Sequence, residues 1–295
     1  MTAKQTCLIT GATGLLGRAL CHHFSDNQWD VRGLARSPDA LQSMGDAVQA
    51  FRGDLPDQVP DEAFENVDVV IHCAYMSRHT THEEARRVNV EGTARVRAAA
   101  LAAGARFVFI SSTGAHEDAL SYYGQSKKTI EESLDPSTDL IIRPGLILGP
   151  GGLFQRIRDS LDSFGVVPVF EGGRQQIQTV HVEDLCHAIH VAVQGGRTGT
   201  FVVAEEDGIE LRDLFRSIAD RLGKRCILLP LPAGPLLLVL RGAESMGLRL
   251  PLSSENVLGA KSLRTQPSAA DLADLGIELR GTGQSLDDLL RNEGG

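Results

Sequence analysis

Tyr123 and Lys127 are four residues apart in a segment whose pattern predicts a helix. This interval places both side chains on one face of the helix, about one turn from each other. A phenol has an ordinary pKa near ~10, too high for proton exchange at neutral pH unless a neighbouring cation stabilises the phenolate. The pair is therefore a candidate for proton transfer, the alternative being a packed tyrosine beside a solvated lysine. Tyr122 is a weaker candidate, because the residue four positions later is Ser126.

Three glycines, Gly11, Gly14 and Gly17, follow an apolar run at residues 6–10 and open a helical pattern that starts at residue 15. The first glycine permits a tight turn, the second lets a pyrophosphate approach the backbone, and the third lets the helix pack on the strand. Free N–H groups at the helix N-terminus face the phosphate charge. The turn predicts a dinucleotide site, against the alternative of a tight turn with no ligand. The expected contributors are Gly11, Thr13, Gly14, Leu15, Leu16 and Gly17.

The spacing Gly-x-x-Gly-x-x-Gly after a threonine resembles the short-chain dehydrogenase/reductase superfamily. Further motifs follow in the order of that superfamily: Gly53-Asp54-Leu55, His72-Cys73-Ala74, Asn89-Val90-Glu91-Gly92-Thr93, Ser111-Ser112 and Tyr123-Gly124-Gln125-Ser126-Lys127. Later motifs resemble its extended branch, the NAD-dependent epimerase/dehydratase family: Arg143-Pro144-Gly145, Gly149-Pro150-Gly151 and Val180-His181-Val182-Glu183-Asp184-Leu185. The resemblance extends from residue 5 to about residue 205.

This resemblance implies an oxidoreductase site with Ser112, Tyr123 and Lys127 as catalytic residues. In such a site the serine orients the substrate oxygen, the tyrosine transfers a proton, and the lysine holds the nicotinamide ribose. Asn89 is expected to organise the strand ends near the site, or else to be a buried hydrogen-bonding residue of its helix. The resemblance also assigns cofactor contacts to Asp54, Leu55, Ala74, Tyr123, Lys127 and Pro144.

The end of the predicted second strand indicates which nicotinamide cofactor binds. An acidic residue there would hold the adenosine ribose hydroxyls and repel a 2′-phosphate. Here the position 18 residues after Gly17 is Ala35, and Arg36 and Ser37 follow it. An arginine can pair with a 2′-phosphate, and a serine hydroxyl can add a hydrogen bond. We therefore expect NADP(H), with NAD(H) as the alternative if Arg36 is only a solvated surface side chain.

The elements that must position these residues alternate between strands and helices. Strands are predicted at residues 6–10, 30–35, 67–73, 106–111 and 139–143, and helices at 15–24, 83–103 and 122–134. This alternation predicts an α/β fold: a Rossmann-type doubly wound parallel sheet with a smaller C-terminal substrate-binding subdomain. The NAD(P)-binding Rossmann domain is expected at residues 1–149, with 177–203 returning to the sheet, and the subdomain at 150–176 and 204–295.

With 29 basic and 38 acidic side chains, the chain has a formal charge of −9. This argues against nucleic acid and anionic membranes as partners, because both need clustered Lys and Arg. No run reaches the ~18 apolar residues of a membrane span, and the apolar stretch at 229–240 predicts a buried helix or a pocket lid. Scattered cysteines and the lack of a leader pattern predict a cytoplasmic protein. No metal site is expected, because the pairs His79/His82 and His187/His190 lack a convincing carboxylate set.

The expected function is NADP-dependent hydride transfer to or from a carbonyl or hydroxyl group of a small-molecule substrate. One alternative is a nucleotide-sugar epimerase, dehydratase or reductase, although the Asn and Arg of such enzymes fall here on Gly145 and within residues 175–179, which hold neither. The other alternative is a regulatory protein that binds NADP without turnover. Residues 83–103 and 122–134 lie where relatives form a dimer interface, so a homodimer is expected by resemblance.

Overall fold

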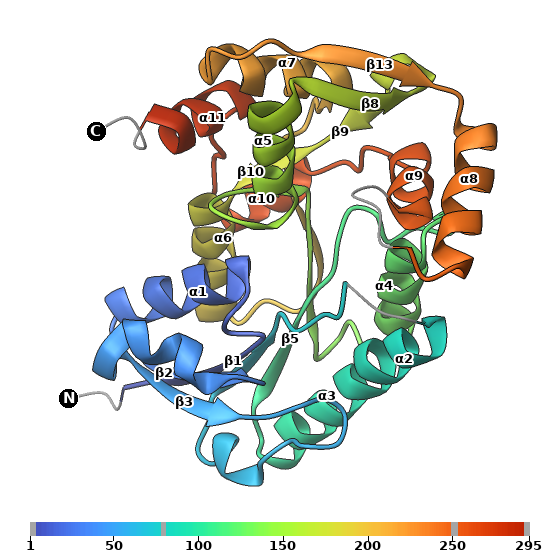
Figure 1. Cartoon of the computed structure of the whole chain (residues 1–295). Helices are drawn as coiled ribbons and strands as arrows, with labels where there is room; N and C mark the ends of the chain where they lie inside the picture. Colours follow the sequence, from blue (N-terminus) through green and yellow to red (C-terminus); the bar gives the residue numbers. More distant parts are fainter. Residues whose placement is uncertain (1–3, 78–80, 249–252, 292–295) are drawn as a thin grey trace.

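Seven parallel strands form one sheet in the computed structural model, which describes residues 4–77, 81–248 and 253–291 (Figure 1). The strand order is β11-β6-β5-β4-β1-β2-β3, so the order reverses between β1 and β4. The α/β fold with a doubly wound parallel sheet is therefore confirmed. The strands are β1 (Thr6–Thr10), β2 (Asp30–Ala35), β3 (Val48–Arg52), β4 (Val69–His72), β5 (Arg106–Ile110), β6 (Leu140–Pro144) and β11 (Gly199–Val203).

Both faces of this sheet are apolar, because consecutive strand residues point to opposite faces and are hydrophobic on each. In β1, Cys7 and Ile9 pack in one core while Leu8 packs in the other. Helices cover both cores, as expected for a parallel sheet. The helices are α1 (Leu15–Asp26) and α6 (Val182–Gln194) on one face, and α3 (Gly92–Ala102) and α4 (Tyr122–Glu132) on the other.

The helix expected at residues 83–103 forms as one helical path with a wider turn in its middle. Helix α2 (His82–Arg86) passes into a π-helical turn, η3 (Arg87–Glu91), and then into α3. Such turns are frequent at functional sites. Asn89 lies in this turn and is only 2% exposed, so the turn presents an amide to the protein interior.

A smaller group of elements lies above the large sheet in Figure 1. It contains three two-stranded pairs: β7 (Leu146–Leu148) with β10 (Thr179–His181), β8 (Val166–Phe170) with β13 (Ile227–Leu231), and β9 (Gln176–Ile177) with β12 (Ile209–Glu210). Phe154, Leu214 and Ile218 belong to its own buried cluster. Its main helices are α5 (Gly152–Phe164), α7 (Leu211–Arg221) and α11 (Thr282–Arg291). The remaining short turns of the chain are η1 (Pro38–Ala47), η2 (Asp61–Ala63) and η4 (Glu171–Gly173).

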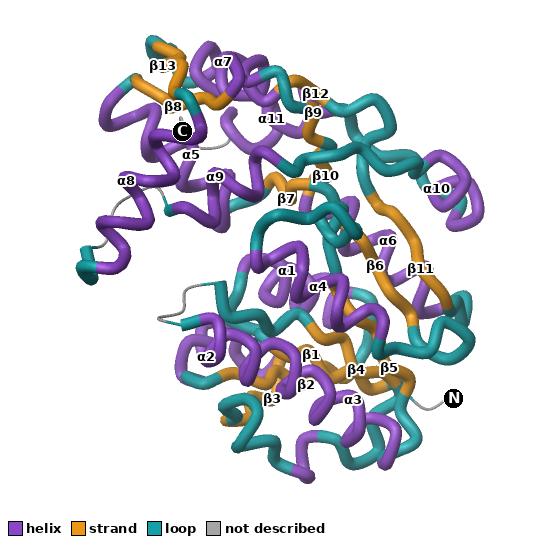
Figure 2. The backbone as a smooth tube through the Cα atoms, turned by 90° about the vertical axis from the view of Figure 1, so that its right-hand side faces the viewer, coloured by secondary structure: helices purple, strands orange, loops and turns teal. Residues whose placement is uncertain are grey.

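Helix α10 (Ala269–Leu275) departs from the expected division, which placed all of residues 204–295 in the smaller part. Leu275 and Ile277 belong to the core under α1 and α6. The Asp271 carboxylate accepts a hydrogen bond from the backbone N–H of Val202 in β11 at 2.7 Å. Figures 1 and 2 show α10 beside α6 and β11, so the C-terminal segment contributes to both parts of the molecule.

The single helix expected at residues 229–240, buried or serving as a pocket lid, forms only from residue 233 onward and is buried on one side only. The stretch divides into β13 and a separate helix, α8 (Ala233–Ser245), which packs on α9 (Ser254–Lys261). Pro230 and Pro232 prevent one continuous helix, because proline lacks an N–H and holds the preceding residue extended. Leu238 is 77% exposed, so the outer side of α8 lies at the surface. Within the described ranges, no helix is both long and apolar enough to cross a membrane.

Candidate active site

The glycine turn after β1 has no room for side chains at two of its three glycines. Gly11 has φ +66°, and a Cβ there would lie 2.8 Å from the Cα of Ala74. A Cβ at Gly17 would lie 2.3 Å from the Gly11 carbonyl oxygen. Gly14 is the N-cap of α1 and has no side chain with which to cover the first-turn N–H groups. This cradle fits a dinucleotide pyrophosphate, which needs close backbone approach and an open helix N-terminus.

The other residues predicted for this turn differ in orientation. Leu16 is 7% exposed and packs in the core with α6, so only its backbone can face a ligand. Leu15 instead lies under the loop that precedes α5, since a Cβ on Gly152 would meet its Cδ2 at 3.2 Å. Thr13 uses its carbonyl to accept a hydrogen bond from Nε of Arg18 at 3.0 Å.

The end of β2 lies directly beside the glycine turn. The backbone N–H of Gly11 donates to the carbonyl of Leu34 at 3.0 Å. Ala35, the next residue, is 5% exposed, and Arg36 and Ser37 follow it as exposed residues. A cation and a hydroxyl therefore stand next to the turn where an acidic side chain would select NAD.

Arg18 is a second cation in this region, which the sequence analysis missed. It comes from the first turns of α1, and besides Thr13 it donates to the carbonyl of Ala40 at 3.1 Å, which joins the glycine turn to the segment after β2. No motif marked it; only its position next to Gly17 could have drawn attention. Arg32 is used elsewhere, because its Nη1 donates to the carbonyls of Ala63 and Glu65 at 3.1 and 2.7 Å.

Asp54 and Leu55 follow β3 in a tight turn. The backbone N–H of Asp54 donates to the carbonyl of Gln58 at 2.9 Å, which leaves its side chain exposed. Leu55 is half-buried and packs on the helix after β4, where a Cβ on Gly92 would lie 3.0 Å from its own Cβ. Asp54 is thus available to a ligand, whereas Leu55 fills the space between the turn and α3.

A buried hydrogen-bond chain holds the end of β4 against β1. Nδ1 of His72 lies 2.8 Å from the Thr10 hydroxyl, and its Nε2 lies 3.0 Å from the Thr93 hydroxyl of α3. Burial lowers the pKa of His72 to about 3, so the ring is neutral at physiological pH. The Thr10 hydroxyl also accepts from the backbone N–H of Ala74 at 3.3 Å, which fixes the residue that faces Gly11.

Asn89 fixes the segment that follows Ala74. Its side-chain oxygen accepts from the backbone N–H of Met76 at 2.6 Å, and its side-chain nitrogen donates to the Met76 carbonyl at 3.1 Å. From its position in the wide turn η3, Asn89 thus makes two hydrogen bonds to the backbone of Met76. Asn89 acts on the strand end through the backbone.

Ser112 and Tyr123 are brought together, although they come from different elements. Ser112 follows β5, and its hydroxyl accepts from the backbone N–H of Gly114 at 3.1 Å. Tyr123 lies in the first turn of α4, which Ser121 caps by accepting from the N–H of Gly124 at 3.3 Å. Burial among surrounding protein raises the pKa of Tyr123 even though 41% of the residue is exposed, and a hydrogen bond with Ser112 partly offsets this rise.

Lys127 is buried, with 4% of its surface exposed, and its ammonium is held below the phenol ring of Tyr75. It donates to the Ile110 carbonyl at 2.6 Å and lies 4.7 and 4.6 Å from the ring centres of Tyr75 and Phe109. Burial lowers the pKa of Lys127 to about 8. We expected a phenol made more acidic by this lysine. The structure instead raises the pKa of Tyr123 and lowers that of Lys127, because both groups are desolvated.

Tyr75 is a site residue that the sequence analysis missed. Its ring meets that of Tyr123 edge-on, with the centres 5.1 Å apart, and its hydroxyl lies 2.8 Å from the Ser126 hydroxyl. Burial raises the pKa of Tyr75 well above its ordinary value. It stands directly after the His72-Cys73-Ala74 motif, and that position is the signal that could have identified it.

A buried ion pair supports the strand ends beneath Ser112. Glu131 of α4 accepts from Ser111 and binds Arg143 at both carboxylate oxygens, at 2.9 and 2.5 Å. These bonds raise the pKa of Arg143. Pro144, predicted to contact the cofactor, is buried at the end of β6, where its carbonyl accepts from the N–H of Thr113 at 3.0 Å.

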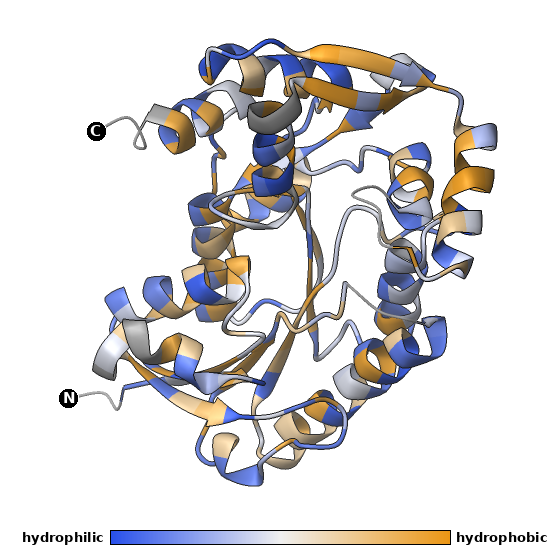
Figure 3. Cartoon of the chain, viewed as in Figure 1, coloured by the Kyte–Doolittle hydropathy of each residue, from blue (hydrophilic) through white to orange (hydrophobic). Residues whose placement is uncertain are grey.

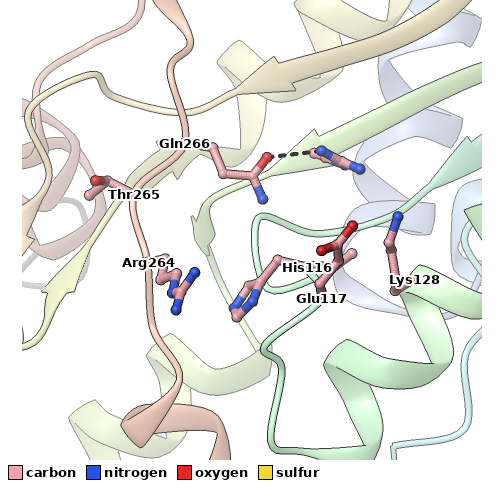
Figure 4. A pocket seen from close by; sticks show the side chains of 8 residues that line it. His116, Glu117, Lys128, Arg264, Thr265 and Gln266 are labelled. Carbon is pink, nitrogen blue, oxygen red and sulfur yellow. Dashed lines mark hydrogen bonds between the residues drawn. The ribbon is translucent and has the colours of Figure 1, made fainter.

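A pocket of about 230 Å³ has Arg143 among its lining residues (Figure 4). Gln266 reaches into it and accepts a hydrogen bond from Arg143 at 3.1 Å. Its cations have acidic partners: Arg264 pairs with Asp118, and Lys128 pairs with Glu132. The described lining residues include none of the three predicted catalytic side chains.

Metal ligands are not grouped in the part of the chain that the structure describes. No three His, Cys, Asp or Glu side chains there lie close enough together to hold an ion. His187 and His190 lie on α6 next to His23, and His79 lies outside the described residues.

The dinucleotide cradle and the Ser112–Tyr123 pair lie in one stretch that matches a known family. The model of the NAD dependent epimerase/dehydratase family matches residues 7–204. The chain belongs to this family. Membership implies an NAD(P) cofactor and a small-molecule substrate, and it identifies the protein as an enzyme of the extended short-chain dehydrogenase/reductase type.

Three similar curated proteins are reductases. The chain is 34% identical to the ceramide reductase of Caulobacter vibrioides over 242 residues, covering 78% of this chain and 74% of that protein. It is 27% identical to the 2-alkyl-3-oxoalkanoate reductase of Stenotrophomonas maltophilia over 252 residues, covering 73% and 75%. It is 26% identical to the 4-hydroxy-2-methyl-3-oxo-4-farnesyl-3,4-dihydroquinoline-1-oxide ketoreductase of Stigmatella aurantiaca over 245 residues, covering 73% and 72%.

Solved structures share the fold over nearly the whole chain. Epimerase Mth375 of Methanothermobacter thermautotrophicus superposes with a TM-score of 0.77 at 16% identity, covering 98% of this chain and 91% of that one. The structure of gox2253 gives a TM-score of 0.76 at 23% identity, covering 99% of both chains. At these identities the similarity establishes the fold alone.

Proposed function

We propose that this enzyme uses NADP(H) to reduce a ketone that carries a long apolar chain. The observation that carries the proposal is the placement of Ser112, directly after β5, and of Tyr123, in the first turn of α4, near the same carboxyl end of the sheet as the glycine cradle. The substrate class is supported by the three reductases above, whose names contain a ceramide, an alkyl-substituted oxoalkanoate and a farnesyl group.

In this reduction the residues of the chain hold the substrate and supply a proton. When bound at Gly11, Gly14 and the open start of α1, NADPH supplies the hydride. Tyr123 donates its phenolic proton to the carbonyl oxygen, which becomes the hydroxyl of the product. The phenol is protonated at neutral pH, as this donation requires, because the ordinary pKa of tyrosine is near ~10 and burial raises it further. Ser112 donates a hydrogen bond to the same oxygen, and Lys127 places a positive charge behind the site.

The proton transfer is tested by Tyr123→Phe, with the neighbouring Tyr122→Phe as the matched control. Loss of a positioned proton donor costs about 10²–10⁴-fold in rate. We therefore expect turnover of a long-chain ketone to fall by about that factor in Tyr123→Phe, with NADPH binding unchanged in a fluorescence titration. The control should retain near wild-type turnover. Equal activity of the two variants would remove Tyr123 from the reaction.

NADPH preference is proposed from Arg36 and Ser37, with Arg18 close by. A charge-assisted bond contributes about 1.5–3 kcal/mol, so Arg36→Ala should weaken NADPH binding by about 10–100-fold and leave NADH binding unchanged. Arg95→Ala, which removes an exposed arginine from α3, is the control. If the ratio of the two dissociation constants does not change in Arg36→Ala, Arg36 does not select the cofactor.

The geometry supports a nucleotide-sugar substrate less well. The segment 175–179 lacks an arginine, and its Gln178 is 2% exposed. The Gln178 side-chain nitrogen donates to the carbonyls of Glu205 and Gln266 at 2.9 and 2.8 Å. Gln178 therefore joins three backbone segments and does not present a donor to a diphosphate.

A further inference from the structure

Helix α8 presents a row of large apolar side chains to solvent. Leu238 is 77% exposed, Val239 64% and Met246, at the C-cap, 71%. A Cβ added at Gly234 or Gly242 would meet nothing within 4 Å. Monomers expose single apolar residues routinely, but a row on one helix marks an interaction surface.

One arc of the exposed side of α8 carries no charge, and the exposed Arg241 and Glu244 lie outside this arc. At 100° per residue, Leu238, Val239, Gly242 and Met246 fall within about 100° of arc, and the other exposed residue of that arc is Pro235. We define this set as the α8 outer face. Figure 2 shows α8 at the edge of the molecule with its C-terminal end projecting outward, and Figure 3 shows apolar residues along the helix and along β13, which leads into it.

We propose that the α8 outer face docks the enzyme onto an anionic lipid bilayer, from which it takes its substrate. The proposal rests on the proposed function, since a ketone with a long apolar chain partitions into membranes. A helix of this kind lies in the interface with its apolar side inserted and does not span the bilayer. The helix has 13 residues, which agrees with an interfacial position.

The size of the face argues against a second copy of the chain as its partner. A stable interface buries ~800 Å² on each partner. The α8 outer face offers three large aliphatic side chains, each smaller than an aromatic ring that buries ~150–250 Å². These side chains are too few for a stable dimer, whereas shallow insertion into a bilayer has no such minimum area.

The charge around the face matches an anionic surface. The described residues 224–248 contain three basic residues and one acidic residue, a local charge of 3 − 1 = +2 in a chain whose total is −9. Lys224 and Arg225 precede β13, and the exposed Arg241 lies on α8 itself. Basic residues next to an apolar helix face strengthen binding to anionic lipid. The overall negative charge therefore does not exclude a membrane surface at this one place.

The inner side of α8 leads toward the catalytic helix. Leu236, Leu237 and Leu240 pack with Phe170 of β8 and Val257 of α9 in one apolar cluster. The acidic side chain of Glu255 in α9 accepts from the backbone N–H of Tyr122 at 2.6 Å, so α9 is bonded directly to the start of α4. The apolar cluster and the Glu255 bond therefore connect α8 to the helix that carries Tyr123.

Vesicle flotation tests the docking with the full chain. Vesicles of phosphatidylcholine alone and of phosphatidylcholine with phosphatidylglycerol are compared, using wild type and the double variant Leu238→Ser/Val239→Ser. Leu101→Ser, which changes a 47% exposed leucine on α3, is the matched control. We expect wild type and control to bind the anionic vesicles, and the double variant to bind at least about tenfold more weakly. Arg241→Gln should reduce the anionic preference and its salt dependence.

Two further readouts separate this proposal from the reductase assignment. NADPH affinity and reduction of a short water-soluble ketone should be unchanged in the double variant. If wild type does not bind vesicles, or the double variant binds equally well, docking is overturned while the reductase assignment stands. A shift from dimer to monomer in the double variant, measured by sedimentation, would identify a second copy as the partner and also overturn docking. Vesicle binding without reduction of any ketone would contradict only the proposed function.

Discussion

Replacing Lys127 by Met should stabilise the protein while abolishing its activity. Lys127 is a buried ammonium whose pKa is lowered from 10.5 to about 8, chiefly by desolvation. Met is of similar length, carries no charge, and suits the space between the rings of Tyr75 and Phe109. The proposed function needs the positive charge of Lys127 at the site, and this same charge lowers the free energy of unfolding.

The expected increase in the free energy of unfolding follows from the lowered pKa of Lys127. At ~1.4 kcal/mol per pH unit, a fall from 10.5 to about 8 corresponds to about 3 kcal/mol of destabilisation at neutral pH. Losing the bond to the Ile110 carbonyl costs about 1–2 kcal/mol in return. Lys127→Met should therefore raise the free energy of unfolding by about 1–2 kcal/mol at pH 7.

The stability difference between Lys127→Met and wild type should depend on pH. Between about pH 8 and pH 10.5 the unfolded chain binds a proton at Lys127 that the folded chain does not, so wild-type stability rises with pH. The advantage of Lys127→Met should shrink across this window and reverse near its upper end. Urea unfolding of wild type, Lys127→Met and Lys128→Met measures this. Lys128 is the matched control, because it is half-buried in an i,i+4 pair with Glu132 and should change stability by less than ~1 kcal/mol. A Lys127→Met protein that is less stable than wild type at both ends of the window would refute the reasoning.

Two further changes test parts of the fold. Burial and the neighbouring His23 lower the pKa of His190 to about 4. The free energy of unfolding of the wild type should therefore fall by about 2 kcal/mol between pH 7 and pH 5, where the unfolded state takes up the proton. In urea unfolding, His190→Phe should lose less stability over this range, and an equal loss would show that His190 is not responsible. Gly17→Ala places a Cβ 2.3 Å from the Gly11 carbonyl, so the turn must move; we expect NADPH binding to weaken by at least tenfold, with Ala19→Gly as a control on α1, and unchanged binding would contradict the tight packing.

The parts of the fold that sequence predicts well are those decided by local chemistry. The buried strands are continuous apolar runs, and the Gly11 turn requires glycine for steric reasons that hold in any context. Tyr123 could be named from its i,i+4 spacing to Lys127 in a predicted helix, and Ser112 from the family resemblance at the end of a predicted strand. Their proximity, however, depends on how α4 lies against β5, which spacing along the chain does not specify.

The missed residues owe their roles to tertiary contacts. Tyr75 lies over Lys127 in the segment after β4, where the next residue, Met76, is hydrogen-bonded to Asn89 of the π turn η3. A pattern with helical period gives no sign of such a turn. The split at residues 229–240 could have been predicted from Pro230 and Pro232, but the exposure of Leu238 could not, since an apolar helix is ordinarily placed in the interior.

Desolvation in the site shifts the protonation equilibria of Tyr123 and Lys127. Tyr75 lies against both Tyr123 and Lys127, burial desolvates both groups, and desolvation favours the neutral form of each. A neutral phenol donates a proton, whereas oxidation of an alcohol would need a phenolate to accept one. Oxidation, which needs the phenolate, should therefore require a higher pH than reduction. Measured in both directions with one substrate pair, the pH optimum of oxidation should lie above that of reduction; coincident optima would mean that Tyr123 does not limit the proton transfer.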